Sequence, residues 1–126
     1  MSQSFEEKFA EAQAAVSAIS PSEANELHSN DTTTLFIDPR SADDISATTG
    51  IIPGALNVTL DDLNEKRSDE LPQELSSSSR TIIAACQGGP MGAIAAHVLK
   101  KRGFSKVFYM DGGTQGWLDA GYATAR

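Results

Sequence analysis

The most reactive side chain in this sequence belongs to its single cysteine, Cys86, which is followed by Gln87, Gly88, Gly89 and Pro90. A thiolate is a strong nucleophile, and backbone N–H groups and the positive end of a helix stabilise it. The two glycines permit positive φ angles, with which a backbone can curl around an anion, and proline is typical of the first residue of a helix. We therefore predict that Cys86 is a nucleophile in a backbone-lined loop at a helix N-terminus. The alternative is a buried structural thiol, the usual role of a free cysteine.

The elements on either side of this loop would hold Cys86 in position. Residues 81–85 are β-branched and apolar, which is typical of a buried strand. After the loop, apolar side chains recur at helical spacing up to Gly103, at Met91, Ile94, Ala95, Val98 and Leu99. Ligands of open α/β sheets bind beyond the carboxyl ends of the strands. The sequence therefore predicts that Cys86 lies at a ligand-binding edge of a sheet.

The rest of the chain alternates predicted helices and strands. Helical spacing of apolar residues predicts a helix from residue 5 to about residue 19, and a short second helix begins at Pro21 and runs through Leu27. Further elements are strands at residues 32–38, 55–58 and 106–110, a loop at 39–54, one or two short helices with a loop at 60–79, and a helix at 114–120. This alternation favours one α/β domain over residues 1–126, with helices on both faces of a central parallel sheet and residues 1–19 as an N-terminal helical extension.

Charge and composition exclude several classes of function. The net charge is −7 and the pI about 4.6, whereas binding to nucleic acid or to an anionic membrane needs a basic surface. No apolar run approaches the roughly 18 residues of a membrane span, and the acidic N-terminus does not resemble a secretory signal. One cysteine and two histidines are too few for a metal centre. We therefore expect a cytoplasmic protein that uses no metal and no cofactor.

Several short motifs, in this order and at this spacing, resemble the single-domain rhodaneses, a family of sulfurtransferases, over almost the full chain. The matching residues are Asp38-Pro39-Arg40, Ile52-Pro53-Gly54-Ala55, Asn57-Val58, Cys86 with Gly89, Gly103-Phe104, Lys106-Val107, Gly112-Gly113, Trp117, Ala120 and Gly121. The resemblance implies a rhodanese-like three-layer fold. It also implies that Cys86 takes sulfane sulfur from a donor, holds it as a persulfide and passes it to a thiol, another nucleophile or a sulfur-accepting protein. The substrate would be bound by the loop residues Gln87, Gly88, Gly89, Pro90, Met91 and Gly92.

Two positions of that loop depart from the family pattern. Active rhodaneses often read Cys-x-x-Gly-x-Arg-Ser, whereas Met91 and Gly92 occupy the arginine and serine positions here. A guanidinium binds oxyanions such as thiosulfate in a bidentate manner, and a thioether does not. We therefore expect a neutral, bulky or protein-borne donor, such as a low-molecular-weight persulfide or a polysulfide, in preference to thiosulfate.

Asp38 and Arg40, which follow the first predicted strand after the N-terminal helices, are interpreted as residues that support the loop. We expect Arg40 to pair with Asp43 or Asp44, and Asp38 to accept hydrogen bonds from backbone N–H groups. Direct contact of either residue with the substrate is the less favoured interpretation.

Three other functions remain as alternatives. A carrier would pass sulfur between proteins with little activity on small molecules, and the missing arginine favours this interpretation. A regulatory module would keep the fold without catalysis, although such a module has no need of Cys86. A cysteine phosphatase or arsenate reductase would need Cys-x5-Arg, and Gly92 stands at the position of that arginine.

Overall fold

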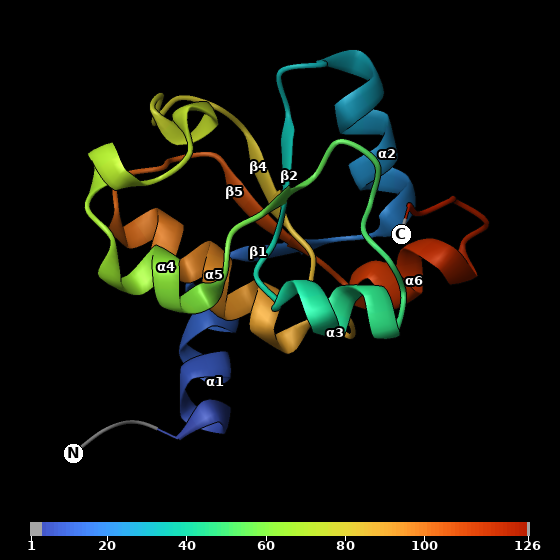
Figure 1. The fold of residues 1–126 in the computed structure, drawn as a ribbon, viewed down its shortest axis with the longest axis horizontal. Coiled ribbons are helices and arrows are strands. Elements are labelled where there is room, and N and C mark those ends of the chain that lie inside the picture. The colour runs from blue at the N-terminus through green and yellow to red at the C-terminus, as the bar shows by residue number, and fades with distance from the viewer. Residues whose placement is uncertain (1–3, 126) are drawn as a thin grey trace.

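The computed structural model describes residues 4–125, so the first three residues of the predicted N-terminal extension lie outside the described residues. Its centre is a sheet of five parallel strands in the order β1-β5-β4-β2-β3 (Figure 1). The strands are β1 (Ser17–Ile19), β2 (Leu35–Asp38), β3 (Leu56–Asn57), β4 (Ile82–Ala84) and β5 (Val107–Met110). The parallel sheet was expected because the predicted strands alternate with helices along the chain.

Six α-helices cover the two faces of this sheet: α1 (Phe5–Ala15), α2 (Pro21–Asn30), α3 (Ala42–Ala47), α4 (Leu60–Glu65), α5 (Pro90–Lys101) and α6 (Gly113–Asp119). Two short 3-10 turns, Ser68–Glu70 and Gln73–Leu75, follow α4. Within residues 4–125, no helix has both the length and the apolar character that a bilayer crossing requires.

The core lies on both faces of the sheet, because successive side chains of a strand point to opposite sides. In β4, Ile82 and Ala84 pack into one apolar cluster with residues of α1, α4 and α5. Ile83, between them, packs into a second cluster with residues of α2 and α6. All three side chains are fully buried. The predicted α/β fold, a parallel sheet flanked by helices on both faces, is therefore confirmed.

Three predicted element boundaries were wrong. The first helix ends at Ala15 instead of near residue 19, because residues 17–19 pair as a parallel edge strand with β5. The second helix continues beyond Leu27 to Asn30. The predicted loop 39–54 contains α3, whose N-cap Ser41 accepts a hydrogen bond from the N–H of Asp44. The edge strand depends on its neighbour in space, which helical spacing alone does not reveal.

All five strands run parallel, but the side on which the chain adds the next strand changes between β2 and β4. From β2 the chain passes outward to β3 on one side, and from β4 it passes outward to β5 on the other. In open α/β sheets, such a switch point leaves a crevice at the carboxyl ends of the two central strands. The loop after β2 carries Asp38 and Arg40, and the loop after β4 carries Cys86, so both predicted loops meet at this crevice.

Candidate active site

The loop that follows β4 holds the sulfur of Cys86 against a backbone amide. Sγ accepts a hydrogen bond of 3.0 Å from the N–H of Gly89, and the Cys86 side chain is 4% exposed. Gly89 has φ +124°, a conformation that side-chain-bearing residues rarely adopt. Gly88 does not have a positive φ, so of the two glycines that permit such an angle only Gly89 uses it. The curl of the loop depends on Gly89 alone.

The backbone at the start of α6 forms hydrogen bonds with the same loop. The N–H of Thr114 donates to the Cys86 carbonyl oxygen at 2.7 Å, and the N–H of Gln115 donates to the Gln87 carbonyl oxygen at 3.0 Å. Gly113, directly before these two residues, has φ +62°, and a Cβ atom there would lie 2.6 Å from both carbonyl oxygens. Gly113 was recognised only as part of a short family motif and was not predicted as a site residue. Its contact with a loop 26 positions earlier in the chain exists only in the folded protein.

The first turn of α5 also lies close to the loop and the end of β4. A Cβ atom on Gly92 would lie 3.1 Å from the Ala84 carbonyl oxygen and 3.2 Å from the Cys86 nitrogen. This spacing leaves little room for any side chain at residue 92. Gly92 therefore brings the N-terminus of α5 close to Cys86, so that the positive end of the helix dipole faces the sulfur.

Asp38 and Arg40 form a buried ion pair beneath the loop. The Nε and Nη2 atoms of Arg40 donate to the two carboxylate oxygens of Asp38 at 3.0 and 2.7 Å, and the side chains are 4% and 2% exposed. Asp38 also accepts the N–H of Arg40 at 3.1 Å, so a backbone bond to Asp38 was predicted correctly. The predicted pairing of Arg40 with Asp43 or Asp44 was wrong, because the bidentate geometry is available to the carboxylate at the end of β2.

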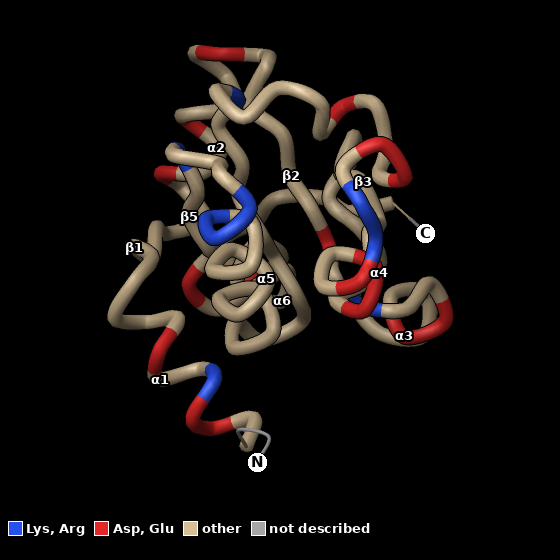
Figure 2. Tube along the Cα trace, turned by 90° about the vertical axis from the view of Figure 1, so that its left-hand side faces the viewer, with Lys and Arg blue, Asp and Glu red and all other residues tan. Residues whose placement is uncertain are grey.

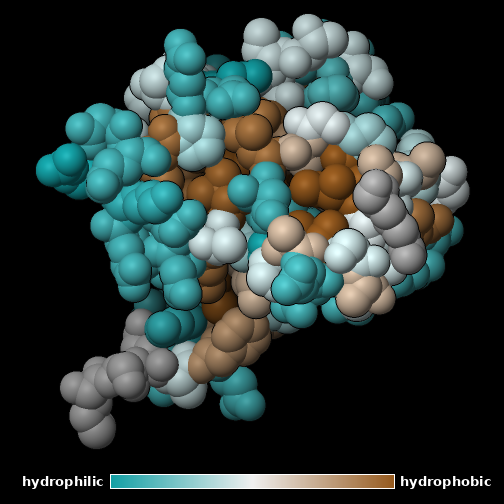
Figure 3. Space-filling model, viewed as in Figure 1, coloured by the Kyte–Doolittle hydropathy of each residue, from teal (hydrophilic) through white to brown (hydrophobic). Residues whose placement is uncertain are grey.

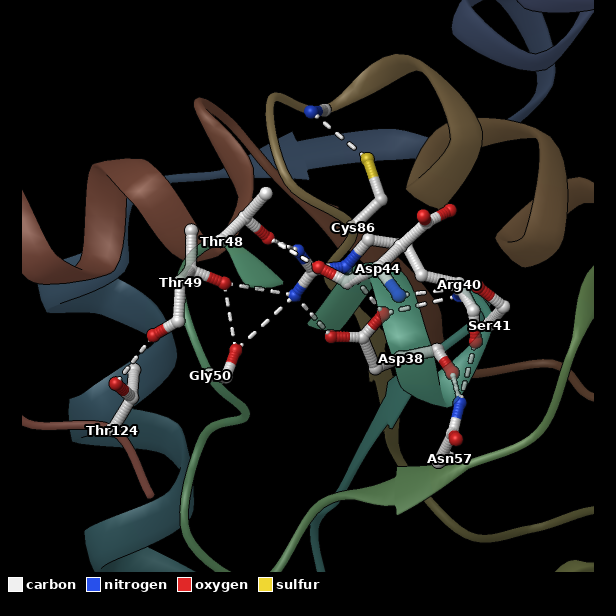
Figure 4. Close-up of polar contacts among 11 residues, drawn as sticks. Asp38, Arg40, Ser41, Asp44, Thr48, Thr49, Gly50, Asn57, Cys86 and Thr124 are labelled. Atoms are coloured by element: carbon white, nitrogen blue, oxygen red, sulfur yellow. Dashed lines mark hydrogen bonds and ion pairs between the residues drawn. The ribbon is translucent and has the colours of Figure 1, made fainter. Parts of the chain in front are cut away.

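The remaining guanidinium contacts of Arg40 bind the loop between α3 and β3. Nη1 donates to the Thr48 hydroxyl at 3.0 Å, and Nη2 donates to the Thr49 hydroxyl at 2.9 Å and the Gly50 carbonyl oxygen at 3.2 Å. Figure 4 shows the guanidinium between Asp38 on one side and these three residues on the other. Arg40 therefore acts as the centre of a polar network that ties two segments together.

Asn57 extends this network to β3. Its Nδ2 atom donates to the Asp38 carbonyl oxygen at 3.1 Å and to the Arg40 carbonyl oxygen at 2.6 Å. The sequence analysis found Asn57 within a family motif but gave it no role. A polar side chain at the end of a short predicted strand was the available signal. Its bond partners lie 17 and 19 positions earlier in the sequence, so spacing did not identify them.

A cavity of about 380 Å³ opens above Cys86. It is lined by Phe5, Arg40, Asp44, Thr48, Cys86, Gln87, Gly88, Pro90 and Met91. Six of the predicted site residues therefore come together around this space, while Asp38, Gly89 and Gly92 support it from outside the lining. Phe5, Asp44 and Thr48 were not predicted as site residues. They come from α1 and from the segment around α3, which lie far from Cys86 in the sequence.

Among the described residues that line this cavity, Arg40 is the one basic residue, and Asp38 already binds it. The basic residues of the last turn of α5 lie elsewhere: the Nζ atom of Lys100 donates to the Ala15 carbonyl oxygen, and Nη1 of Arg102 to that of Leu63. Arg67, on the segment after α4, is 77% exposed and pairs with Asp69 and Glu70. Across residues 4–125, no group of three His, Cys, Asp or Glu side chains could hold a metal ion.

Comparisons with known proteins agree with this fold. A sequence model of the family named Rhodanese-like domain matches residues 20–120. A search of the curated proteins finds no match.

Three solved structures illustrate the shared fold. A Rhodopseudomonas palustris protein of unknown function, described as a possible tyrosine phosphatase, is 23% identical with a TM-score of 0.85, over 99% of this chain and 96% of that chain. The polysulfide-sulfur transferase homodimer of Wolinella succinogenes is 20% identical with a TM-score of 0.75, over 96% and 86%. A human single-domain sulfurtransferase is 23% identical with a TM-score of 0.67, over 81% and 95%.

Proposed function

Because the chain belongs to the rhodanese-like domain family, we propose that it is a sulfurtransferase that carries sulfane sulfur on Cys86 as a persulfide. One observation carries the proposal: the Cys86 sulfur accepts the N–H of Gly89 at 3.0 Å beside an open cavity of about 380 Å³. This arrangement provides a nucleophile, a donor for its negative charge and space for a substrate.

Loading is a transfer of one sulfur atom between two thiolates. The Cys86 thiolate attacks the outer sulfur of a donor persulfide, R–S–SH, and a bond forms between that sulfur and Sγ. The donor S–S bond breaks and its electron pair leaves with R–S⁻, so no external oxidant or reductant is needed. The product, Cys86–S–SH, gives its proton to R–S⁻ or to water and becomes an anionic persulfide. The N–H of Gly89 and the first-turn N–H groups of Met91 and Gly92, which have no partner within the helix, stabilise the anionic persulfide.

Discharge reverses the roles of the sulfur atoms. The thiolate of an acceptor attacks the outer sulfur of the Cys86 persulfide, the new S–S bond forms on the acceptor, and Cys86 leaves as a thiolate. The leaving thiolate returns to the hydrogen bond of Gly89, and the acceptor carries away one sulfane sulfur. The protein needs no second cysteine and no cofactor for this cycle, because every electron pair stays on sulfur.

The lining of the cavity favours persulfide or polysulfide donors over thiosulfate. The side chain of Met91 has no hydrogen-bond donor for an oxyanion, and the guanidinium of Arg40 is engaged by Asp38, Thr48, Thr49 and Gly50. Thiosulfate carries two negative charges, which would enter the cavity beside the carboxylate of Asp44. A neutral or protein-borne donor avoids this repulsion.

A sulfur carrier that exchanges only with other proteins is the second candidate. The acidic residues of α3 and α4, drawn red in Figure 2, favour it, and one of them, Asp44, lines the cavity. Attraction of a basic partner would weaken as ionic strength rises, whereas transfer between neutral small thiols would not. A phosphatase function is disfavoured, because the arginine that binds phosphate would stand at Gly92. A side chain there meets the Ala84 carbonyl oxygen at 3.1 Å.

Intact mass spectrometry tests the proposal. The protein is incubated with glutathione persulfide, with thiosulfate or with neither, in parallel with Cys86→Ser. We expect a gain of one sulfur atom, about 32 Da, with glutathione persulfide and none in Cys86→Ser. Circular dichroism shows whether the variant is folded. Absence of any gain in the folded wild-type protein, with small donors and with persulfidated protein, overturns the proposal.

A further inference from the structure

The N-terminal helix α1 places an aromatic side chain in the lining of the Cys86 cavity. Phe5 belongs to this lining, although it precedes the family segment, which begins at residue 20. Its side chain is 51% exposed, and within residues 4–125 only Leu27 is a comparably exposed large apolar residue. An exposed aromatic side chain at the mouth of a cavity is typical of a surface that binds an apolar group.

A capping box orders the start of α1, and two contacts with other elements fix its position. Ser4 and Glu7 form a capping box at its N-terminus, in which each side chain accepts the backbone N–H of the other residue. Ala12 is fully buried in the core cluster that includes α5. At the other end, the Nζ atom of Lys100 on α5 donates to the Ala15 carbonyl oxygen at 2.7 Å. Phe5, the first residue of this docked helix, therefore keeps a defined position beside the Cys86 loop.

Met91 and Pro90 complete an apolar wall with Phe5. Both residues are half-buried at the start of α5, and a thioether adapts its shape to different apolar groups. Figure 3 shows apolar surface between α1 and α3, the two helices that flank the cavity. The organic part of a substrate could therefore pack against the apolar side chains of Phe5, Pro90 and Met91.

The lining of the cavity also carries negative charge. Asp44 lines it, and in Figure 4 its carboxylate points away from the Arg40 guanidinium. An adjoining cavity of about 280 Å³ shares Arg40 and Met91 with the first and adds Asp61. Since Asp38 engages Arg40, neither cavity presents an unpaired cation from its lining residues. The electrostatic environment therefore disfavours an anionic substrate.

We infer that Phe5 and Asp44 select the sulfur acceptor, and that the preferred acceptor is a thiol with an apolar organic body and no negative charge. The apolar body packs against Phe5 and Met91 while its thiolate attacks the outer sulfur of the Cys86 persulfide. A positive charge on the acceptor interacts favourably with Asp44. This inference rests on the proposed function, and it assigns a role in specificity to a residue outside the family segment.

The first experiment measures discharge of a preloaded Cys86 persulfide, whose formation is checked by mass. Benzyl mercaptan is compared with 2-mercaptoethanol to test the apolar body of the acceptor, and cysteamine with mercaptoacetate to test its charge. Each rate is divided by the rate at which the same thiol reacts with glutathione persulfide in the absence of the protein. We expect Phe5→Ala to lower the preference for benzyl mercaptan about threefold to tenfold, and Phe5→Leu to restore most of it. Leu27→Ala, the other exposed apolar residue, is the matched control and should leave the ratio unchanged.

The second experiment tests the charge without sulfur transfer. Iodoacetamide and iodoacetate are of similar size, and only the second is an anion, so their rates of alkylation of Cys86 report the local potential. We expect Asp44→Asn to raise the rate of iodoacetate relative to iodoacetamide about threefold, and Asp43→Asn, outside the lining, to have a smaller effect.

The outcomes separate this inference from the proposed function. If Cys86 loads with sulfur but Phe5→Ala and Asp44→Asn leave both ratios unchanged, the inference is overturned and the sulfurtransferase proposal stands. If Cys86 does not load, the proposed function fails and the acceptor inference fails with it. The alkylation ratios then still show whether Asp44 controls the charge of ligands that reach Cys86.

Discussion

The carbonyl oxygen of Cys86 lies so close to Gly113 that a Cβ atom on Gly113 would stand 2.6 Å from it. No side chain fits in this space without movement of one of the two backbones. Because the next two amides of α6 donate to the Cys86 and Gln87 carbonyl oxygens, the close approach is what lets α6 hold the loop. The conformation of the candidate nucleophile thus depends on a glycine in a different element.

We expect Gly113→Ala to lower the free energy of unfolding by about 1–3 kcal/mol, because it combines a positive φ with a backbone clash. Displacement of the loop should also slow sulfur loading of Cys86. Gly88→Ala is the matched control for stability, since a Cβ there meets no atom within 4 Å. Thermal denaturation compares the two variants, and equal melting temperatures would contradict the assigned role of Gly113.

The buried pair of Asp38 and Arg40 should contribute strongly to stability. Arg40→Met leaves the Asp38 carboxylate buried without its partner, which costs about 3–5 kcal/mol and lowers the melting temperature by about 10 °C or more. Arg67→Met removes an ion pair that is 77% exposed and should change stability by less than about 1 kcal/mol. Urea denaturation measures both changes. A similar small loss in both variants would show that the Arg40 network is not needed for the fold.

Met91→Arg should create the ability to use thiosulfate. A guanidinium at the mouth of the cavity would bind the oxyanion in a bidentate manner, and we expect the rate of sulfur transfer from thiosulfate to rise at least about tenfold. Met91→Leu keeps the apolar surface and should not increase that rate. The assay follows sulfur transfer from thiosulfate to cyanide. A wild-type rate already as high as that of Met91→Arg would refute the role given to Met91.

Thr114 carries a buried hydroxyl that lacks a hydrogen-bond partner among the described residues. Thr114→Val removes this polar atom with little change in shape, so we expect unchanged stability or a gain of up to about 1 kcal/mol. Thr49→Val is the contrasting variant, because its hydroxyl accepts from Arg40 and donates to Gly50, and it should cost about 1–3 kcal/mol. A large loss in Thr114→Val would indicate that its hydroxyl has a partner, such as a bound water.

His97 on α5 should make the protein less stable in mild acid. Burial holds the pKa of His97 below its usual value of 6.5; the positive charge of Lys101 adds to this effect and Glu11 opposes it. In the interval between the lowered pKa and 6.5, the unfolded chain binds more protons than the folded chain, so stability falls as pH decreases through it. Melting temperatures between about pH 5 and pH 8 should therefore decline less steeply in His97→Gln than in the wild type. Equal slopes of melting temperature against pH in the wild type and in His97→Gln would contradict this role of His97.

Much of the site was predictable because its signals are local. An apolar strand that runs into Cys86, followed by glycines and a helix-starting Pro90, specifies a loop at a helix N-terminus from neighbouring residues alone. The capping boxes at Ser4 and Ser20 are equally local, and both are present. Sequence patterns therefore located the candidate nucleophile and the type of fold.

Tertiary structure decided the contacts that join distant segments. It paired residues 17–19 with β5, gave Arg40 the carboxylate of Asp38 in place of Asp43 or Asp44, and brought Gly113 against the Cys86 loop. It also placed Phe5 in the cavity lining. Each of these contacts depends on which groups lie close together in the folded chain. Asp38, Asp43 and Asp44, for example, carry the same carboxylate, and only the geometry of the fold decides which of them pairs with Arg40. The sequence by itself thus determined the position of the candidate nucleophile, Cys86. The folded chain determined what surrounds it, because close packing across the switch point of the sheet selects those neighbours.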